Sequence, residues 1–149
     1  MMKLYKHTQV GYFLIVSYSA VILLLGSLNI VTDFHPIPLA GLIIMLIVVG
    51  IFATLTVKVN NRRMEIQFGL GFIRKGFLLK DIQAYRAVEN PWYYGWGIRY
   101  TPRGWLYNVS GFTAIELQMK SGKIYRIGTD EPNNLAKALD EALKEVSVD

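Results

Sequence analysis

The chain has 149 residues, of which 52% are hydrophobic and 18% are charged, and its formal net charge is +5. It contains no cysteine, which excludes disulfides, thiolate zinc sites, iron–sulfur clusters and cysteine nucleophiles. The shortage of charge is local, because Asp33 is the one ionised side chain between Lys6 and Lys58. After Lys58 the composition is that of an ordinary globular domain, in which about 25% of residues are charged.

Two long uncharged segments precede that domain, at residues 7–32 and 34–57. As helices they would be roughly 39 and 36 Å long, whereas the hydrocarbon core of a bilayer is about 30 Å thick. The turn between them holds a charge and two prolines, which cannot continue the first helix. The sequence therefore predicts a transmembrane hairpin in residues 1–57, with helices at about 10–32 and 38–57.

The alternatives are a signal peptide followed by a buried helix, or two core helices. The apolar part of a signal peptide is shorter and ends in small residues, and no such cleavage pattern follows here. Orientation follows from the basic residues near the spans, which are Lys3, Lys6, Lys58, Arg62 and Arg63. They predict two spans of the cytoplasmic membrane with both termini on the cytoplasmic side.

The domain at 58–149 begins with alternating apolar and polar residues at 55–59 and 64–68, which is typical of half-buried strands. Asn60-Asn61 between them tolerates the backbone of a tight hairpin turn. Because no flexible linker follows the second apolar segment, we expect the domain to be held against the membrane face.

Further strands are predicted from alternation and from turn signals such as Pro102-Arg103-Gly104 and Ser121-Gly122. The period then changes to that of an amphipathic helix, which begins near Pro132 and extends to about residue 146. About seven strands followed by one helix favour a curled sheet that the helix closes at one end. The additional strand candidates are residues 77–79, 82–88, 96–100, 105–109, 114–119 and 124–127.

This layout resembles the bacterial pleckstrin-homology-like (PH-like) domains, many of which follow a short transmembrane hairpin. The resemblance rests on the runs F-G-L-G-F-I-R-K-G-F-L-L-K-D-I at 68–82, Y-G-W-G-I-R at 94–99 and I-G-T-D-E-P at 127–132. It implies a PH-like open β-barrel of about seven strands capped by a C-terminal helix, and a membrane location, but no reaction. The layout and the string K-D-I-Q at 80–83 also resemble a photosystem I assembly factor.

Residues with catalytic or ligating chemistry are few. The two histidines, His7 and His35, are predicted on opposite sides of the membrane, so they cannot share a metal. No metalloprotease, hydrolase or phosphate-loop motif is present. Asp130-Glu131 lies where a helix is predicted to start, and acids are favourable there. We therefore expect neither enzymatic activity nor a cofactor or metal site.

Basic residues gather in the half of the domain that follows the hairpin. Residues 58–103 hold nine lysines and arginines against three acids, and each basic side chain near an anionic leaflet contributes about 1 kcal/mol. The expected position of Lys58, Arg62 and Arg63 is the closest to the membrane. Instead of contacting lipid headgroups, these basic residues could simply orient the membrane anchor or contact a protein partner. The candidate lipid-headgroup contacts are Lys58, Arg62, Arg63, Arg74, Lys75, Arg99 and Arg103.

Aromatic residues are dense between 92 and 107, where seven occur in 16 residues. Such side chains suit a membrane interface, a protein-binding hot spot or the core of a sheet. Pro91 and Gly95 favour a loop around Trp92, Tyr93 and Tyr94, so these three are the best candidates for exposed rings. The candidate interface or partner aromatics are Trp92, Tyr93, Tyr94 and Trp96.

These features predict a non-catalytic integral membrane protein whose cytoplasmic domain acts as a protein-interaction or assembly module. One alternative is a surface module that binds anionic lipid, and a second is protection against a membrane-active toxin. The expected partners are the lipid bilayer together with another membrane protein or anionic lipid. Nucleic acid is not expected, because the domain is tethered to a membrane.

Overall fold

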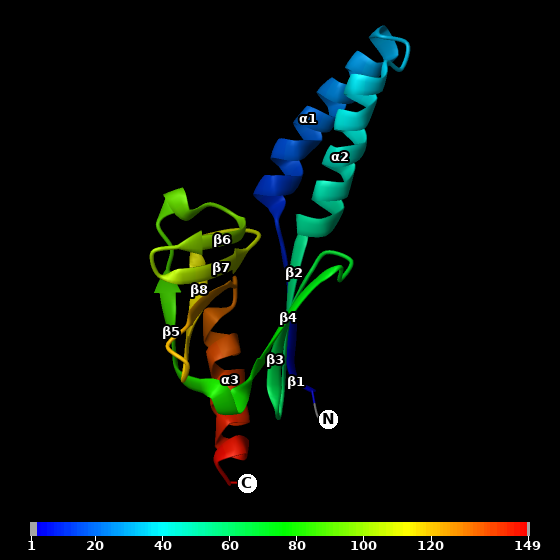
Figure 1. The fold of residues 1–149 in the computed structure, drawn as a ribbon. Helices are drawn as coiled ribbons and strands as arrows, with labels where there is room; N and C mark the ends of the chain where they lie inside the picture. Colours follow the sequence, from blue (N-terminus) through cyan, green and yellow to red (C-terminus); the bar gives the residue numbers. More distant parts are fainter. Residues whose placement is uncertain (1–2, 149) are drawn as a thin grey trace.

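The computed structural model describes residues 3–148 and has an α+β architecture (Figure 1). The helices are α1 (Tyr12–Val31), α2 (Pro36–Phe52) and α3 (Pro132–Val148), with short 3-10 turns η1 (Leu79–Asp81) and η2 (Trp92–Tyr94). The strands are β1 (Lys3–Val10), β2 (Thr54–Asn60), β3 (Arg63–Phe68), β4 (Ile73–Leu78), β5 (Ile82–Glu89), β6 (Gly97–Thr101), β7 (Gly104–Asn108), β8 (Thr113–Met119) and β9 (Ile124–Gly128).

The first sheet has the order β1-β2-β3-β4 and is antiparallel throughout. Strand β1 was not expected from the sequence, which indicated only a basic flank before the first helix. Its pairing with β2 makes the two helices the connection of a β-hairpin. In Figure 1 β1 leads up to α1, and β2 leads away from α2 beside it. At the junction the amide of Gly11 donates to the carbonyl of Ala53 at 2.7 Å.

Helix α2 ends at Phe52, and strand β2 begins at Thr54, so the helix is shorter than the uncharged segment that contains it. The residues after Phe52 include the β-branched Thr54, Thr56 and Val57, which favour extended backbone. Leu55 and Val57 also point into the core from β2, where both are buried. The alternating pattern after Phe52 therefore forms a strand, and the helix does not continue.

The second sheet has the order β5-β8-β9-β7-β6, in which β7 and β9 pair in parallel and the other neighbours are antiparallel. Nine strands are thus formed in residues 3–148, against about seven expected. Within this range the two sheets have no strand pair in common, and no closed barrel is formed. The 3-10 turn η1 leads the chain from β4 in the first sheet to β5 in the second.

Helix α3 fills the space between the two sheets, as Figure 1 shows, and it begins at the predicted residue. It contacts β1 and β2 on one side, and β5 and β8 on the other. Its apolar stripe, Leu135, Ala138, Leu139 and Ala142, is buried in the common core. The inner faces of both sheets supply the remaining core residues, among them Phe68, Ile115 and Ile127.

The two helices α1 and α2 pair with each other and project from the end of the first sheet (Figure 1). By length and composition, α1 is apolar enough to cross a membrane, and it is the one helix in residues 3–148 that meets both criteria. Helix α2 is equally free of charge but has 17 residues. Most large apolar side chains of this hairpin are exposed, including Leu23, Val31 and Ile37.

Candidate interaction surfaces

The aromatic turn, defined here as Trp92, Tyr93 and Tyr94 of η2, connects β5 to β6 at one end of the second sheet. Trp92 is 77% exposed and Tyr93 is 66% exposed, whereas Tyr94 is half-buried. The rings pack edge to face along the turn, with centroids 5.9 Å apart for Trp92 and Tyr93 and 5.3 Å apart for Tyr93 and Tyr94. This places two of the four candidate aromatics in solvent.

Flanking residues explain why the chain turns here. Pro91 has a fixed φ suited to the start of a short helix, and Gly95 adopts a φ of 66° that favours glycine. The amide of Tyr94 donates to the carbonyl of Pro91 at 3.0 Å. Backbone geometry therefore directs Trp92 and Tyr93 outward.

A buried ion pair beneath the aromatic turn holds it in place. Arg126 on β9 donates to the carboxylate of Glu116 on β8 at 2.8 Å, and both side chains are almost fully buried. The same guanidinium donates to Oδ1 of Asn90 at 3.0 Å, and it lies over the ring of Tyr94 at 5.9 Å. Arg126 thus supports the aromatic turn at two points, through Asn90 just before it and through the ring of Tyr94 within it.

The protonation of Glu116 follows from this environment. Burial alone would raise the pKa of the Glu116 carboxyl, but hydrogen bonds and charge from Arg126 and Arg86 outweigh burial and lower the pKa. The guanidinium of Arg86 lies 2.9 Å from the Glu116 carboxylate, and the Arg86 side chain is itself largely exposed. Glu116 therefore stays ionised and keeps Arg126 fixed.

Trp96, the fourth candidate aromatic, lies at a different place from the aromatic turn. Its ring packs against Phe13 in the first turn of α1, with centroids 4.5 Å apart, and against Phe112. Its indole N–H donates to the carbonyl of Gly111 at 3.2 Å. Trp96 therefore connects the helical hairpin to the second sheet and is only partly accessible.

A second aromatic pair was not singled out from the sequence. Tyr100 on β6 and Trp105 on β7 are exposed and pack edge to face at 5.4 Å. They line a hollow of about 500 Å³ together with Arg103, Lys123 and others. Their opposition across a β-hairpin is the signal that could have located them, because Pro102-Arg103-Gly104 sets that register.

The structure divides the seven candidate basic residues among several places. Four of them, Lys58, Arg63, Arg74 and Lys75, line one hollow of about 200 Å³ on the first sheet. Arg99 lies beside the base of the helical hairpin, where it donates to the carbonyl of Trp96 at 2.9 Å, and Arg103 lies near Tyr100. The Arg62 side chain is exposed at the turn after β2.

The position of Arg62 and Arg63 differs from the expectation that they lie closest to the membrane. Strand β2 runs away from α2 for seven residues, roughly 20 Å, before the chain reaches them. They therefore lie at the end of the first sheet farthest from the helices. Arg74 is nearer to α2, because β4 starts on the same side as β2 does.

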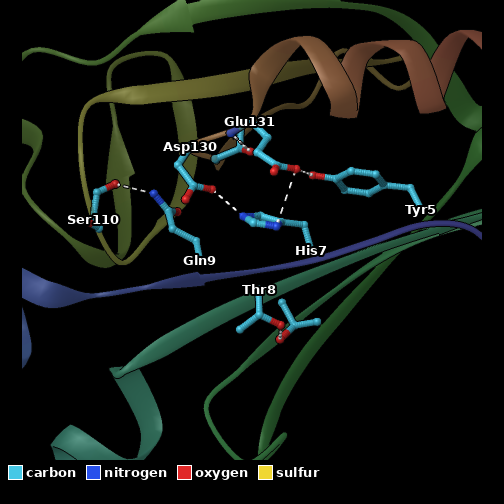
Figure 2. Close-up of polar contacts among 9 residues, drawn as sticks. Tyr5, His7, Thr8, Gln9, Ser110, Asp130 and Glu131 are labelled. Carbon is cyan, nitrogen blue, oxygen red and sulfur yellow. Dashed lines mark hydrogen bonds and ion pairs between the residues drawn. The ribbon is translucent and has the colours of Figure 1, made fainter.

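Figure 2 shows a polar cluster, formed by Tyr5, His7, Asp130 and Glu131, that joins β1 to the start of α3. Nε2 of His7 lies 2.6 Å from the Asp130 carboxylate, and Nδ1 lies 3.5 Å from that of Glu131. The Tyr5 hydroxyl donates to Glu131 at 3.2 Å, and burial followed by the Glu131 charge raises the pKa of Tyr5. The sequence missed this arrangement because β1 was not expected.

This cluster has a structural role at the start of α3. Asp130 and Glu131 do precede the helix, as expected, and the Glu131 amide donates to the Thr129 hydroxyl at 3.0 Å. Next to it, Gln9 on β1 donates to the carbonyl of Ser110 at 3.0 Å. Across residues 3–148, no group of three or more histidine or acidic side chains is placed to hold a metal ion.

Comparison of the chain with models of protein families, with curated proteins and with solved structures gave no match.

Proposed function

We propose that this protein is a non-catalytic membrane protein whose α1–α2 hairpin is embedded in the bilayer of the cytoplasmic membrane. The support is the uncharged, exposed surface of both helices and the basic residues Lys6 and Lys58, which lie on β1 and β2, the strands that join the helices to the sheet. At 17 residues α2 is roughly 26 Å long, and a small mismatch with the bilayer is accommodated by local thinning or by flanking residues. In this arrangement β1, β2 and both chain ends face the cytoplasm.

The domain after the hairpin is proposed to be a PH-like fold. The support is the order of the elements along the chain. An antiparallel sheet is followed by a second sheet, and then by a helix that closes the space between them. The addition of β1 to the first sheet and the parallel β7–β9 pair are departures from the simple seven-strand layout. In this proposal the added strand β1, which continues into α1, fixes the hairpin to the domain.

The activity proposed for this domain is docking of a membrane-protein partner, as an assembly or interaction module. The observation that carries it is the aromatic turn, where Trp92 and Tyr93 are exposed on a support fixed by buried Arg126. Tryptophan and tyrosine are the residues most enriched in binding hot spots. A pre-ordered turn also lowers the entropy lost when a partner binds.

The test is cross-linking in the native membrane followed by purification of the full-length protein and mass spectrometry. A stoichiometric partner should be recovered with the wild type and lost with the double variant Trp92→Ala/Tyr93→Ala. Tyr100→Ala is the matched control, because it removes an equally exposed ring from the same sheet. Equal recovery from the aromatic-turn variant and the wild type would contradict the proposal.

The hollow lined by Lys58, Arg63, Arg74 and Lys75 supports a second candidate, which is contact with anionic lipid headgroups. Glu65 lies in the same hollow and pairs with Arg63 at 2.7 Å, so the net charge available to a lipid is reduced. This function predicts that anionic lipid is retained on the purified protein at low salt and lost at high salt. Retention that is unchanged by Lys58→Glu and Arg74→Glu would exclude it.

A further inference from the structure

The loop between β3 and β4, defined here as the β3–β4 tip (residues 69–72), carries two exposed apolar side chains. Leu70 and Phe72 are each 78% exposed, whereas their neighbour Phe68 is buried. Tight turns at the surface are usually built from polar residues and glycine. Leaving a leucine or a phenylalanine in water instead of burying it costs about 1.5–3 kcal/mol.

The β3–β4 tip lies against the end of α2. The amide of Gly69 donates to the carbonyl of Thr54 at 2.9 Å. A Cβ at Gly69 would overlap the carbonyl oxygens of Gly50 and Ile51 in the last turns of the helix. This contact places Leu70 and Phe72 at the level of the apolar helix and away from the polar end of the sheet.

The surface between the β3–β4 tip and α2 is a hollow of about 560 Å³ whose lining side chains are all apolar. They are Ile43, Leu46, Ile47 and Ile51, with Gly50, from the helix, and Leu70 and Phe72 from the tip. The helix residues involved extend over roughly 12 Å of α2. The tip therefore continues the apolar surface of the hairpin sideways over its last turns.

Polar residues begin immediately beyond the tip. Gln67 and Arg74 are paired across β3 and β4, and the Arg74 side chain donates to the carbonyl of Gly71 at 2.8 Å. An arginine at this level can keep its stem on apolar surface while its head reaches a lipid phosphate. From the tip to Arg74, apolar side chains come first and a cation follows. A lipid leaflet has the same order, with acyl chains followed by charged headgroups.

We infer that the β3–β4 tip inserts Leu70 and Phe72 into the same leaflet that α2 enters, with lipid acyl chains filling the hollow beside α2. This inference rests on the proposed membrane embedding of the hairpin. It adds a third point of attachment, displaced from the helix axes. Tilting and rotation of the whole protein relative to the bilayer are therefore restricted, and the orientation of the aromatic turn above the membrane is fixed.

The test uses single cysteines, which the cysteine-free chain allows without background. Full-length Phe72→Cys is labelled with an environment-sensitive fluorophore and reconstituted in vesicles that contain lipids with a quencher on the acyl chain. Ile47→Cys, on the exposed face of α2, reports on the hairpin itself. Ser121→Cys, in the exposed β8–β9 turn, is the solvent control.

Quenching at residues 47 and 72 but not at 121 is the expected result. Quenching at 47 without quenching at 72 would overturn the inserted tip and leave the embedded hairpin standing. No quenching at 47 would overturn the proposed embedding and, with it, this inference. A label at 72 that is accessible in pure lipid vesicles but shielded in native membranes would also overturn it, because a protein would then cover the tip.

A second variant guards against a labelling artefact. Leu70→Ser/Phe72→Ser, made in the Ile47→Cys chain, should leave quenching at 47 unchanged, because the hairpin remains embedded. In a separate chain with Ser121→Cys as its single cysteine, a spin label should show restricted motion relative to the bilayer, and adding Leu70→Ser/Phe72→Ser should remove that restriction. Unchanged motion of that label would contradict the role of the tip as a third attachment point.

Discussion

The guanidinium of Arg126 lies 2.8 Å from the carboxylate of Glu116, and both side chains are only 7–8% exposed. Removing one partner of a buried ion pair leaves the other charged and desolvated, which typically costs 3–5 kcal/mol. We expect Arg126→Met to lower the free energy of unfolding by about 3 kcal/mol, because Arg86 still contacts Glu116. Denaturant unfolding of the full chain in detergent micelles measures this.

The same variant should loosen the aromatic turn as well as the core. Exchange of the Tyr94 amide, which donates to Pro91 at 3.0 Å, should become faster than in the wild type. Lys123→Met is the control, since it removes an exposed cation from the residue just before the same strand. Wild-type exchange at Tyr94 in Arg126→Met would show that the turn does not depend on the ion pair.

The lowered pKa of Glu116 predicts a specific loss of stability in acid. A carboxyl whose pKa is lower in the folded than in the unfolded state stabilises the fold above the unfolded pKa, which is about 4.3. That contribution is lost as the pH falls through the folded pKa. The difference in unfolding free energy between wild type and Glu116→Gln should therefore be constant above about pH 5 and shrink below about pH 4. A difference that stays constant down to pH 3 would be inconsistent with this shift.

An alkaline transition is expected from Tyr85, whose hydroxyl donates to Asp140 and to the carbonyl of Ala136 on α3. Burial first, and then the bond to Asp140, raises its pKa to about 12. A raised pKa means that the neutral phenol stabilises the fold below about pH 10 and that this contribution is lost as the pH rises toward the folded value. Tyr85→Phe should therefore depend less steeply on pH than the wild type between pH 10 and 12, when both are measured by alkaline unfolding.

The strands after the hairpin were predictable because their patterns are local. Alternation located β2, β3 and β5 to β9 within a few residues, and the apolar stripe located α3. Strand β1 was missed because its core-facing side chains include Tyr5, His7 and Gln9, so apolar alternation is absent. These side chains form hydrogen bonds with Glu131, Asp130 and Ser110, and only the tertiary structure brings these residues together.

For the candidate surfaces, too, local features were predictable from the sequence, whereas long-range contacts were not. Proline and glycine around Trp92 and Tyr93 made their exposure predictable from local turn chemistry. The support from Arg126 was not predictable, because it lies 32 or more residues away along the chain and depends on the order of strands in the sheet. The position of Arg62 was misjudged because nearness to α2 in sequence was taken as nearness in space, whereas β2 leads away from the helix.

Gly69 should be more sensitive to substitution than Gly122, although both have a positive φ. It has a φ of 48°, and a Cβ there would also overlap the end of α2. Gly122, in the β8–β9 turn, has a φ of 86° but open space around the position of a Cβ. Gly122→Ala should lose about 1 kcal/mol from backbone strain alone, and Gly69→Ala should lose clearly more. Equal losses in thermal unfolding would argue against the close contact between the tip and α2.

The contact between Phe13 and Trp96 provides a direct test of how the hairpin is joined to the second sheet. Their ring centroids are 4.5 Å apart, and packed aromatic pairs contribute about 0.5–1.5 kcal/mol beyond the area they bury. A double-mutant cycle with Phe13→Ala and Trp96→Ala should therefore give a coupling energy in that range. The control cycle pairs Phe13→Ala with Tyr100→Ala, whose ring packs on Trp105 instead, and should be additive. Additivity in both cycles would mean that α1 is held to the domain by its backbone connection to β1 and not by the Trp96 ring.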